Sequence, residues 1–285
     1  GIVILALIFG MMLNEPALGT SFPLFYASGF LPFTMFNSMA AKIALSIRFS
    51  RPFLAYPSVT FIDTMIARAL LNMLTNIAVI AIVITGIFIV YQIPPVVNMA
   101  AIFESLVMIS LLGIGVGSMN CYLMTAFPVW ERTWQIVTRP LFLISGTLFL
   151  YDFMPSSVQN LLWYNPLLHC VGLMRRGIYS VYPADYVSEG YIVSLSLVLL
   201  ASGLLALSGL AQAAQVNLYT TREPVLIQPL LKEFTESSGI KVNTVFIKDG
   251  LLERVKAEGR RSPADVMLTV DFGNLVDLVE ADLTQ

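Results

Sequence analysis

The sequence predicts an all-α polytopic membrane protein of about six spans, followed by a partial α/β lobe of βαβαβα order. Three observations lead to this prediction. The 285 residues are 57% hydrophobic and 12% charged, with a mean hydropathy of +0.79, whereas soluble proteins carry roughly 25% charged residues. Only 15 of the first 210 residues are charged, against 19 of the last 75. Beyond residue 215 the apolar periodicity changes to short strands alternating with helices.

Long runs without charge predict the membrane-crossing helices, because a bilayer core of roughly 30 Å requires about 20 apolar residues in a helix. Uncharged stretches of 26, 35, 26 and 32 residues lie at 16–41, 69–103, 105–130 and 190–221. Pro94 and Pro95 divide the second stretch, so its span is expected at 69–92. A fifth span is expected at 139–153, and a first span, which we expect to lack its upstream half, at 1–13.

The apolar stretch 158–174 is too broken for a full crossing, since it contains Asn165-Pro166 and His169 and stops at Arg175-Arg176. We expect it to form a re-entrant or interfacial element, in which protein or water satisfies the freed backbone groups.

The distribution of basic residues predicts the orientation of the spans. Two loops carry Lys or Arg: Lys42, Arg48 and Arg51 follow the second span, and Arg132 and Arg139 follow the fourth. The loops at 14–21 and 92–99 carry neither. By the positive-inside rule the two basic loops are cytoplasmic. Arg175 and Arg176 then fall on the outer side, which is unusual for a basic pair and indicates either a local error in this topology or a functional feature.

Several polar features of the apolar part have a structural and a functional interpretation. Asp63 and Arg68 are favoured as interfacial residues at the start of a span, and Glu104 as a boundary residue. Gly113, Gly115 and Gly117 are expected to let helices approach closely. Tyrosines and a tryptophan crowd the expected outer side, where a belt at the lipid headgroups is favoured, although flat aromatic faces also suit sugar rings: Tyr151, Tyr164, Tyr179, Tyr182, Tyr186, Tyr191 and Trp163.

The sequence contains no pattern typical of an enzyme. A net charge of −2 gives no basic field for nucleic acid. A nucleophile with its base, a phosphate-binding loop and a paired-carboxylate site are all missing from the residue pattern. His169 beside Cys170 is too small a set for a metal site. We therefore expect a non-enzymatic protein that binds no cofactor itself.

Four segments in the right order resemble the membrane subunit of ABC transporters that export capsular or O-antigen polysaccharide, the ABC type-2 permeases. They are LGTSFPLFYASGFLPFTMF (18–36), SRPFLAYPSVTFIDTMIAR (50–68), SGTLFLYDFMP (145–155) and NPLLHCVGLMRRGIYSVY (165–182). The resemblance implies a multi-pass protein of the bacterial inner membrane that pairs with a second permease copy. It also implies a separate ATPase subunit that binds ATP, membrane lipid around the spans, and a polysaccharide substrate.

The resemblance also assigns residues. The loop 46–57 corresponds to the cytoplasmic segment that couples to the ATPase, with Arg48, Arg51, Pro52 and Tyr56. The outer re-entrant and translocation region corresponds to Asn165, Pro166, His169, Arg175, Arg176, Tyr179 and Tyr182. We expect the interfacial helix that precedes the first span in this family, also an ATPase contact, to be missing here.

The last seventy residues read as alternating strands and helices. Strands are expected at 215–221, 241–247 and 264–270, and helices at 223–239, 249–259 and 272–283. This order predicts βαβ units with parallel strands, amounting to half a lobe.

This part resembles the opening of periplasmic iron(III)-binding proteins of ABC importers. The resemblance rests on NLYTTRE (217–223), GIKVN (239–243), LLERVKAEG (251–259) and SPADVMLTVD (262–271). It places Tyr219 on a tyrosine ligand position and Glu223 where relatives often have histidine, so both are possible vestigial iron ligands. The tyrosine pair that dominates iron binding in that family lies in a later lobe, and a strand-end role for Tyr219 is therefore favoured.

The expected division is a permease domain at 1–195, a junction at 196–214 and a partial solute-binding lobe at 215–285. The junction completes the last span and also ends Ala211-Gln212-Ala213, like a signal-peptide cleavage site. The sequence therefore indicates a chimera of two fragments. The function we expect is polysaccharide export. The alternatives are an iron(III) import component with a tethered lobe, in which Fe³⁺ is bound, and a chimera without function.

Overall fold

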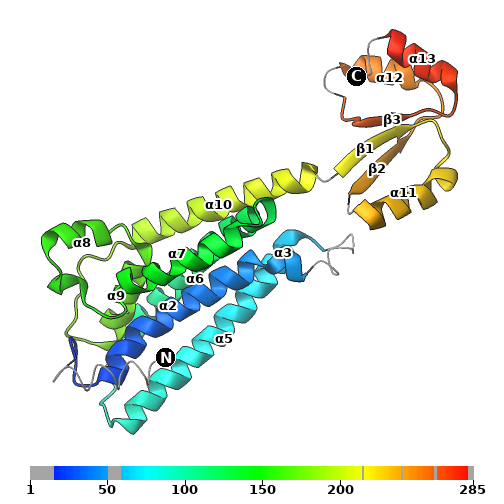
Figure 1. The fold of residues 1–285 in the computed structure, drawn as a ribbon. Coiled ribbons are helices and arrows are strands. Elements are labelled where there is room, and N and C mark those ends of the chain that lie inside the picture. The colour runs from blue at the N-terminus through cyan, green and yellow to red at the C-terminus, as the bar shows by residue number, and fades with distance from the viewer. Residues whose placement is uncertain (1–15, 51–58, 214, 239, 260–261, 282–285) are drawn as a thin grey trace. The chain divides into compact units, whose positions relative to one another are not determined.

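A computed structural model describes residues 16–50, 59–213, 215–238, 240–259 and 262–281 (Figure 1). The chain divides into two compact units, Gly1–Ala206 and Leu207–Gln285, and the long helix α10 belongs partly to each. The predicted first span at 1–13 lies outside the described residues.

In its described part the first unit consists of helices and the loops that connect them, without a strand. Its elements are α2 (Phe22–Ala44), α3 (Ser46–Phe49), α5 (Phe61–Val90), α6 (Met99–Ala126), α7 (Trp130–Ile144), the 3₁₀ turn Tyr151–Phe153, α8 (Ser156–Leu162), α9 (Pro166–Ile178) and α10 (Glu189–Ala213). Three described helical segments are long and apolar enough to cross a membrane: Phe61–Val90, Met99–Ala126 and Glu189–Leu210. The prediction of a mostly helical protein with apolar helices long enough to span a membrane is therefore confirmed.

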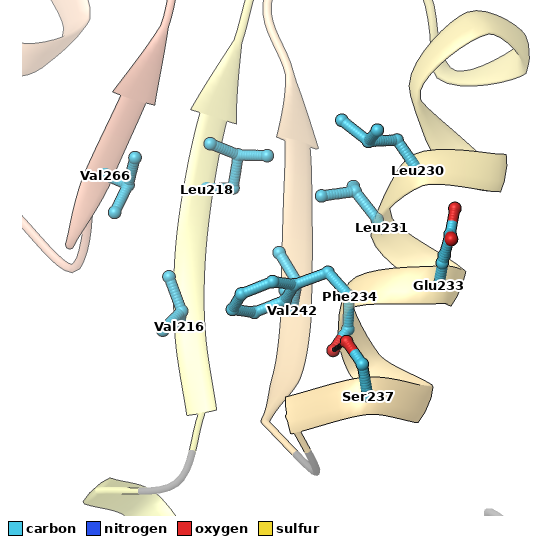
Figure 2. Close-up of a pocket in the computed structure, with 9 residues that line it drawn as sticks. All are labelled: Val216, Leu218, Leu230, Leu231, Glu233, Phe234, Ser237, Val242 and Val266. Carbon is cyan, nitrogen blue, oxygen red and sulfur yellow. Dashed lines mark hydrogen bonds between the residues drawn. The ribbon is translucent and has the colours of Figure 1, made fainter.

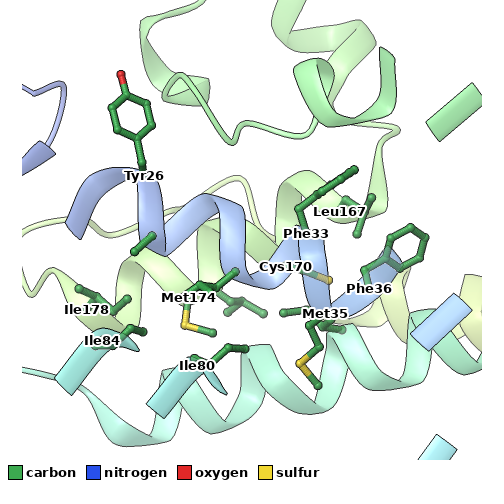
Figure 3. Close-up of a cluster of buried hydrophobic side chains, with 14 of the residues drawn as sticks. Tyr26, Phe33, Met35, Phe36, Ile80, Ile84, Leu167, Cys170, Met174 and Ile178 are labelled. Carbon is green, nitrogen blue, oxygen red and sulfur yellow. The ribbon is translucent and has the colours of Figure 1, made fainter. Parts of the chain in front are cut away.

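Helix α2 forms the centre of the first unit and packs against α5, α6 and α9. Its first turn contains Pro23. N–H groups in the first turn of a helix have no intrahelical partner, so proline, which lacks an N–H, suits this position. Figure 3 shows the apolar cluster that these helices share. It includes Phe33, Met35 and Phe36 of α2, Ile80 and Ile84 of α5, and Cys170, Met174 and Ile178 of α9.

The three glycines of α6 lie where neighbouring helices come closest, as predicted. A Cβ at Gly113 would lie 3.0 Å from Cβ of Met39, and one at Gly117 would lie 2.8 Å from Cβ of Ile43, both on α2. A Cβ at Gly115 would lie 2.5 Å from the carbonyl oxygen of Ser196 on α10. Small side chains at these positions therefore allow α6 to pack against α2 and α10.

The fifth predicted span has different limits in the structure. Instead of a helix at 139–153, α7 occupies Trp130–Ile144, and Gly146 follows with a φ of +72°, in the left-handed region where glycine ends helices. The boundary at Arg139 was wrong, because this charged residue lies inside α7 rather than before it. Residues 158–174 form two short helices, α8 and α9, instead of one long helix, in agreement with the predicted interruption.

The second unit contains a three-stranded parallel sheet in the order β2-β1-β3. Its elements are β1 (Gln215–Thr220), α11 (Pro224–Ser238), β2 (Lys241–Phe246), α12 (Leu251–Glu258), β3 (Val266–Leu268) and α13 (Phe272–Glu280). In the register, Leu218 pairs with Thr244 of β2 and with Val266 of β3. The predicted βαβαβα order along the chain and the parallel pairing of the strands are confirmed.

The two faces of this sheet differ. Tyr219 packs with residues of α12 and α13 in a buried core that also contains Leu251, Val255 and Leu278. On the opposite face an open apolar groove of about 630 Å³ runs between the sheet and α11, with Leu218 and Phe234 among its walls (Figure 2). Successive side chains of a strand point to opposite faces, which explains why Leu218 and Tyr219 differ in surroundings.

Candidate functional site

Two polar clusters of the first unit contain the described candidate residues for coupling and translocation. The first, called here the Arg48 cluster, consists of Arg48, Phe49, Arg68 and Glu131. The second, the Arg175 cluster, consists of Arg175, the carbonyl groups of Thr147 and Phe149, the ring of Phe25, and the neighbouring Arg176. Arg51, Pro52 and Tyr56 lie outside the described residues.

The Arg48 cluster joins the two loops that the positive-inside rule places on one side. Arg48 Nη1 lies 3.3 Å from Glu131 Oε2, and the two side chains are 71% and 38% exposed. The Arg68 guanidinium lies 5.2 Å from the ring centre of Phe49, which is itself exposed. A cavity of about 350 Å³ beside the ion pair is bounded by α3 and by residues 124–131. This arrangement leaves an arginine, a carboxylate and an aromatic ring accessible to a partner.

Trp130 anchors the start of α7, which carries Glu131. Its indole Nε1 donates a hydrogen bond of 2.8 Å to Oδ1 of Asn120, a residue buried in α6. The position of Glu131 opposite Arg48 is therefore fixed by the end of α6 and not by the exposed ion pair alone.

Arg175 is buried although it carries a charge, with 2% of its surface exposed. Its Nη1 donates to the carbonyl of Phe149 at 2.7 Å, and its Nη2 donates to that of Thr147 at 3.2 Å. The guanidinium also lies over the ring of Phe25 on α2, 4.5 Å from its centre. Gly29 of α2 leaves room for the guanidinium of Arg175, since a Cβ at Gly29 would lie 3.1 Å from Nη2 of Arg175. Arg175 thus attaches the loop after α7 to α2 and α9.

Arg176 has a different role from its neighbour, because successive helical residues point about 100° apart. It lies 3.5 Å from Glu104 on α6 and 4.0 Å from Glu189 at the start of α10. The boundary residue Glu104 therefore belongs to an ion-pair network that ties three helices at one end of the unit. The unusual basic pair of the sequence divides into one buried hydrogen-bonding residue and one partly exposed ion-pair residue.

Asn165, Pro166 and His169 shape the start of α9. Asn165 caps the helix by accepting from Leu167 N at 3.1 Å, and it donates to the carbonyl of Ile144 at 3.1 Å. Pro166 occupies the first turn. Ser188 N donates to His169 Nδ1 at 3.1 Å, so the proton belongs on Nε2, which donates to the carbonyl of Trp163 at 2.7 Å. Both ring nitrogens of His169 are used in hydrogen bonds within the protein.

The aromatic side chains of this end are packed on one another around His169. Its ring lies between those of Trp163, Tyr186 and Tyr191, with centroid separations of 5.2, 5.9 and 5.6 Å. Tyr179 and Tyr182 are also buried, and the hydroxyl of Tyr179 has no hydrogen-bond partner among the described groups. Tyr164 is exposed. Trp163, Tyr186 and Tyr191 are thus partly buried against His169.

In the second unit Tyr219 is buried and hydrogen-bonded. Its hydroxyl lies 3.1 and 3.2 Å from the two carboxylate oxygens of Glu258, and Arg254 lies 5.2 Å from its ring centre. Ser262 and Arg254 donate to the same carboxylate and hold the pKa of Glu258 below its usual range. Glu223 is exposed just before α11.

Asp271 caps α13 by accepting from Asn274 N at 2.9 Å. No group of three His, Cys, Asp or Glu side chains suited to a metal ion occurs within the described ranges. Tyr219 itself belongs to the buried core of the second unit.

A helical unit with membrane-crossing helices, joined to a small parallel α/β unit, defines a membrane protein with an appended α/β segment. No protein-family model matches the chain. The chain is 28% identical over 226 residues to the polysialic acid transport protein KpsM of Escherichia coli, which covers 79% of this chain and 83% of KpsM. It is 24% identical over 192 residues to the capsule polysaccharide export inner-membrane protein CtrC of Neisseria meningitidis serogroup B, covering 67% of this chain and 72% of CtrC.

A second similarity is to a different class of protein. Over 62 residues the chain is 50% identical to iron uptake protein A1 of Synechocystis sp., a match that covers 21% of this chain and 17% of that protein. Both resemblances found in the sequence are therefore confirmed, one to capsule polysaccharide export permeases and one to a short part of an iron uptake protein.

Sequence reasoning missed two contributions to these clusters. The ion pairs of Arg176 with Glu104 and Glu189 join residues far apart in the chain, and no local pattern links them. Gly29 carries a signal that could have been used, since a glycine within an otherwise bulky helix indicates close approach of another segment.

Proposed function

We propose that the chain is the membrane permease subunit of an ATP-driven exporter of cell-surface polysaccharide, located in the bacterial inner membrane. The observation that carries this proposal is the 28% identity to KpsM over 79% of the chain, supported by the named export and inner-membrane role of CtrC. The three membrane-crossing helices agree with this function. In this proposal the permease has about six spans, and α8 with α9 forms the re-entrant element.

The proposed partners follow from the same function. The permease itself hydrolyses nothing, ATP is bound and hydrolysed on a separate ATPase subunit, and a second permease copy completes the passage for the polysaccharide. The Arg48 cluster is proposed as the docking site for the ATPase, because it presents Arg48, Glu131 and Phe49 beside a cavity. The Arg175 cluster, with Asn165, Tyr179 and Tyr182, is proposed to shape the outer end of the passage.

Complementation tests the function directly. A strain that lacks its capsule permease and retains its own ATPase receives the chain, and surface polysaccharide is measured with a capsule-specific antibody. Restored surface polysaccharide is the expected result. Polymer that accumulates inside the cells at normal levels of the membrane-inserted chain would contradict the proposal.

Docking of the ATPase is tested by co-purification with two variants that break the same ion pair. Arg48→Glu reverses the proposed docking charge and is expected to abolish co-purification. Glu131→Gln removes the ion pair but leaves the positive charge of Arg48, and is expected to retain the ATPase. Equal retention by both variants would exclude Arg48 from the docking site.

A second candidate function is iron(III) import, favoured by the 50% identity to iron uptake protein A1. We propose it as the weaker candidate, since Tyr219 is buried and bonded to Glu258 while Glu223 is exposed before α11. The segment 215–285 is then a partial solute-binding lobe joined to the permease. Titration of the full chain with ferric citrate distinguishes iron import from polysaccharide export. The titration is monitored by the tyrosine-to-iron charge-transfer absorbance. An absorbance band that is lost in Tyr219→Phe would favour iron import.

A further inference from the structure

Helix α7 carries charged residues on an open face. None of its fifteen residues is buried, in contrast to α2 and α6 beside it. Arg132, Gln135 and Arg139 follow one another at intervals of three and four residues, so they lie on one side of the helix. All three are exposed, and we call them the α7 stripe.

The two arginines of the α7 stripe have no counter-ion in the described part of the chain. Neither Arg132 nor Arg139 forms an ion pair or a side-chain hydrogen bond with another described residue. Glu131, the acidic residue beside them, pairs with Arg48. The stripe therefore presents two uncompensated positive charges with an amide between them.

Helix α7 runs antiparallel to α2 (Figure 1). Glu131 at its start pairs with Arg48, which follows the end of α2. Near the other end of α7, the ring of Phe142 lies 5.2 Å from that of Phe33, centre to centre, in the middle of α2. The two helices therefore lie beside each other over about half of α2.

The contacts between these helices give the depth of Arg139. It precedes Phe142 by three residues, or about 4.5 Å, which puts it level with Phe36 of α2. The carbonyl oxygen of Phe36 lies 3.7 Å from the position of a Cβ at Gly113, near the middle of the membrane-crossing helix α6. Arg139 thus lies at about the mid-depth of α6, two turns deeper than Arg132.

A lipid environment does not suit this face of α7. A charged residue at such depth is costly in hydrocarbon, and intramembrane charges face a protein interior or a water-filled cavity. Pro140 adds a second cost, because it lacks an N–H and leaves the carbonyl of Ile136 without its helical donor. Ile136 is 69% exposed, and water can satisfy its carbonyl whereas lipid cannot. The open face of α7 therefore indicates contact with water.

Helix α7 also connects the two clusters proposed for the ends of the passage. Its first turn carries Glu131 of the Arg48 cluster. The loop after it carries Thr147 and Phe149, whose carbonyls accept from Arg175. A water-filled passage between the two ends would therefore run along α7.

We propose that the α7 stripe lines the passage and binds the anionic groups of an acidic polysaccharide, an inference that rests on the proposed function in export. The guanidinium groups of Arg132 and Arg139 pair with carboxylates of the polymer, and Gln135 donates to its oxygens between them. The arginines are two turns apart, about 10.5 Å, so one extended polymer contacts both. The stripe thus selects acidic over neutral polymers.

Access to water is tested by thiol modification of the full chain in phosphatidylcholine nanodiscs. Gln135→Cys keeps both arginines and places a thiol between them, and Ile82→Cys places one on the exposed face of α5. Cys121 and Cys170 are buried and give the background. A membrane-impermeant thiosulfonate is expected to modify Gln135→Cys at least about tenfold faster than Ile82→Cys, since apolar surroundings suppress the reactive thiolate. Equal rates would overturn the proposal.

Recognition of charge is tested by protection of Gln135→Cys. Trigalacturonate, with a carboxylate on each ring, is expected to slow the modification, whereas maltotriose of the same length is not. Adding Arg139→Gln is expected to weaken trigalacturonate binding about tenfold or more, because a charge-assisted hydrogen bond is lost. Adding Arg139→Lys keeps the charge and is expected to retain protection. Equal protection by both sugars, protection by neither, or protection that survives Arg139→Gln would each contradict the proposal.

Two further measurements separate the alternatives. Phosphatidylglycerol in the nanodiscs is expected to leave the modification rate unchanged, and slowing as strong as that by trigalacturonate would show that the stripe holds lipid headgroups instead. In a strain with an acidic capsule, Arg139→Gln is expected to restore at most about a tenth of the wild-type surface polysaccharide, from the same tenfold loss. Full restoration would refute the stripe and leave export intact. Protection by trigalacturonate without restoration by the wild-type chain would contradict the proposed function alone.

Discussion

The two units of the chain place apolar and polar side chains in opposite ways. In the first unit the long helix α5 exposes large apolar side chains such as Leu71 and Ile82, whereas serines and an asparagine of α6 are buried. In the second unit the buried core is small and apolar, and the charges lie mainly on the surface. Exposed apolar surface on α5 is what a lipid environment requires, whereas the apolar groove of Figure 2 lies between one face of the sheet and α11.

The difference shows which contacts hold the elements of each unit together. The buried hydroxyls of α6 bond in two ways: Ser110 donates to the carbonyl of Leu106 in its own helix, whereas Ser105 donates to the carbonyl of Cys170 on α9 at 2.8 Å. A bond of the first kind holds no helix to another, and a bond of the second kind does. Close approach at glycines and the ion pairs of Arg176 also join helices of the first unit. In the second unit, backbone hydrogen bonds between the paired strands hold neighbouring strands together.

The largest expected effect in this comparison comes from Arg175→Met. Removal of the guanidinium leaves the carbonyls of Thr147 and Phe149 without their donors, and we expect the free energy of unfolding to fall by about 2–4 kcal/mol. Unfolding in mixed micelles with increasing SDS, followed by circular dichroism, measures the change. Arg176→Met removes only partly exposed ion pairs and should cost less than about 1 kcal/mol. Similar losses in both variants would show that the buried hydrogen bonds of Arg175 stabilise the fold no more than the partly exposed ion pairs of Arg176.

Close helix packing is tested by two glycine substitutions of opposite expected sign. Gly115→Ala places a Cβ 2.5 Å from the carbonyl oxygen of Ser196, so α6 and α10 must separate, at a cost of about 1–3 kcal/mol. Gly86→Ala on α5 meets nothing within 4 Å and should stabilise the helix by up to about 1 kcal/mol. The same SDS titration compares them. Stabilisation by both would refute the close approach of α6 and α10.

The exposed pair Arg48–Glu131 is expected to matter little for stability. Exposed ion pairs contribute about 0–1 kcal/mol, so Glu131→Gln should change the free energy of unfolding by no more than this. A combined Arg48→Glu and Glu131→Arg exchange restores the pair with reversed charges and should be as stable as the wild type. A loss above 2 kcal/mol in the single variant would mean that this end depends on the pair for its fold.

The smallest effect is a pH dependence confined to the second unit. The pKa of Glu258 is lowered in the folded state, so its contribution to stability is present above its ordinary value of 4.5 and is lost as the pH falls through the lower folded value. Hydrogen exchange of the full chain, measured on peptides covering 241–259, should accelerate below pH 4.5. In Glu258→Gln this acidic acceleration should be reduced, and an unchanged profile would remove Glu258 as its source.

The α/β part of the fold could be predicted closely, and the helical part only coarsely. Strands and helices of the second unit begin and end near turn residues such as Gly250, which has a positive φ, so the boundaries lie within a few residues of those predicted. In the first unit charges served as boundaries, and this failed at Arg139, which lies inside α7. A charge count cannot distinguish a helix that lies at an interface from one that crosses the membrane.

The candidate sites were predictable by residue but not by role. The sequence marks Arg175 and Arg176 equally, and only their packing separates a buried donor from an ion-pair residue. Asp63, which was expected to be an interfacial residue, forms a reciprocal capping box with Thr60, a role that was not anticipated from the sequence.

The capping box at Thr60 also determines how α5 fits a bilayer. Asp63 Oδ2 accepts from Thr60 N at 2.8 Å and fixes the helix start at Phe61, which gives α5 thirty residues. At 1.5 Å per residue this length is about 45 Å, well beyond a hydrocarbon core of roughly 30 Å. The uncharged segment 69–90 alone spans about 33 Å, so the first two turns project into the headgroup layer. An upright α5 would thus carry Asp63 and Arg68 at the depth of the phosphates.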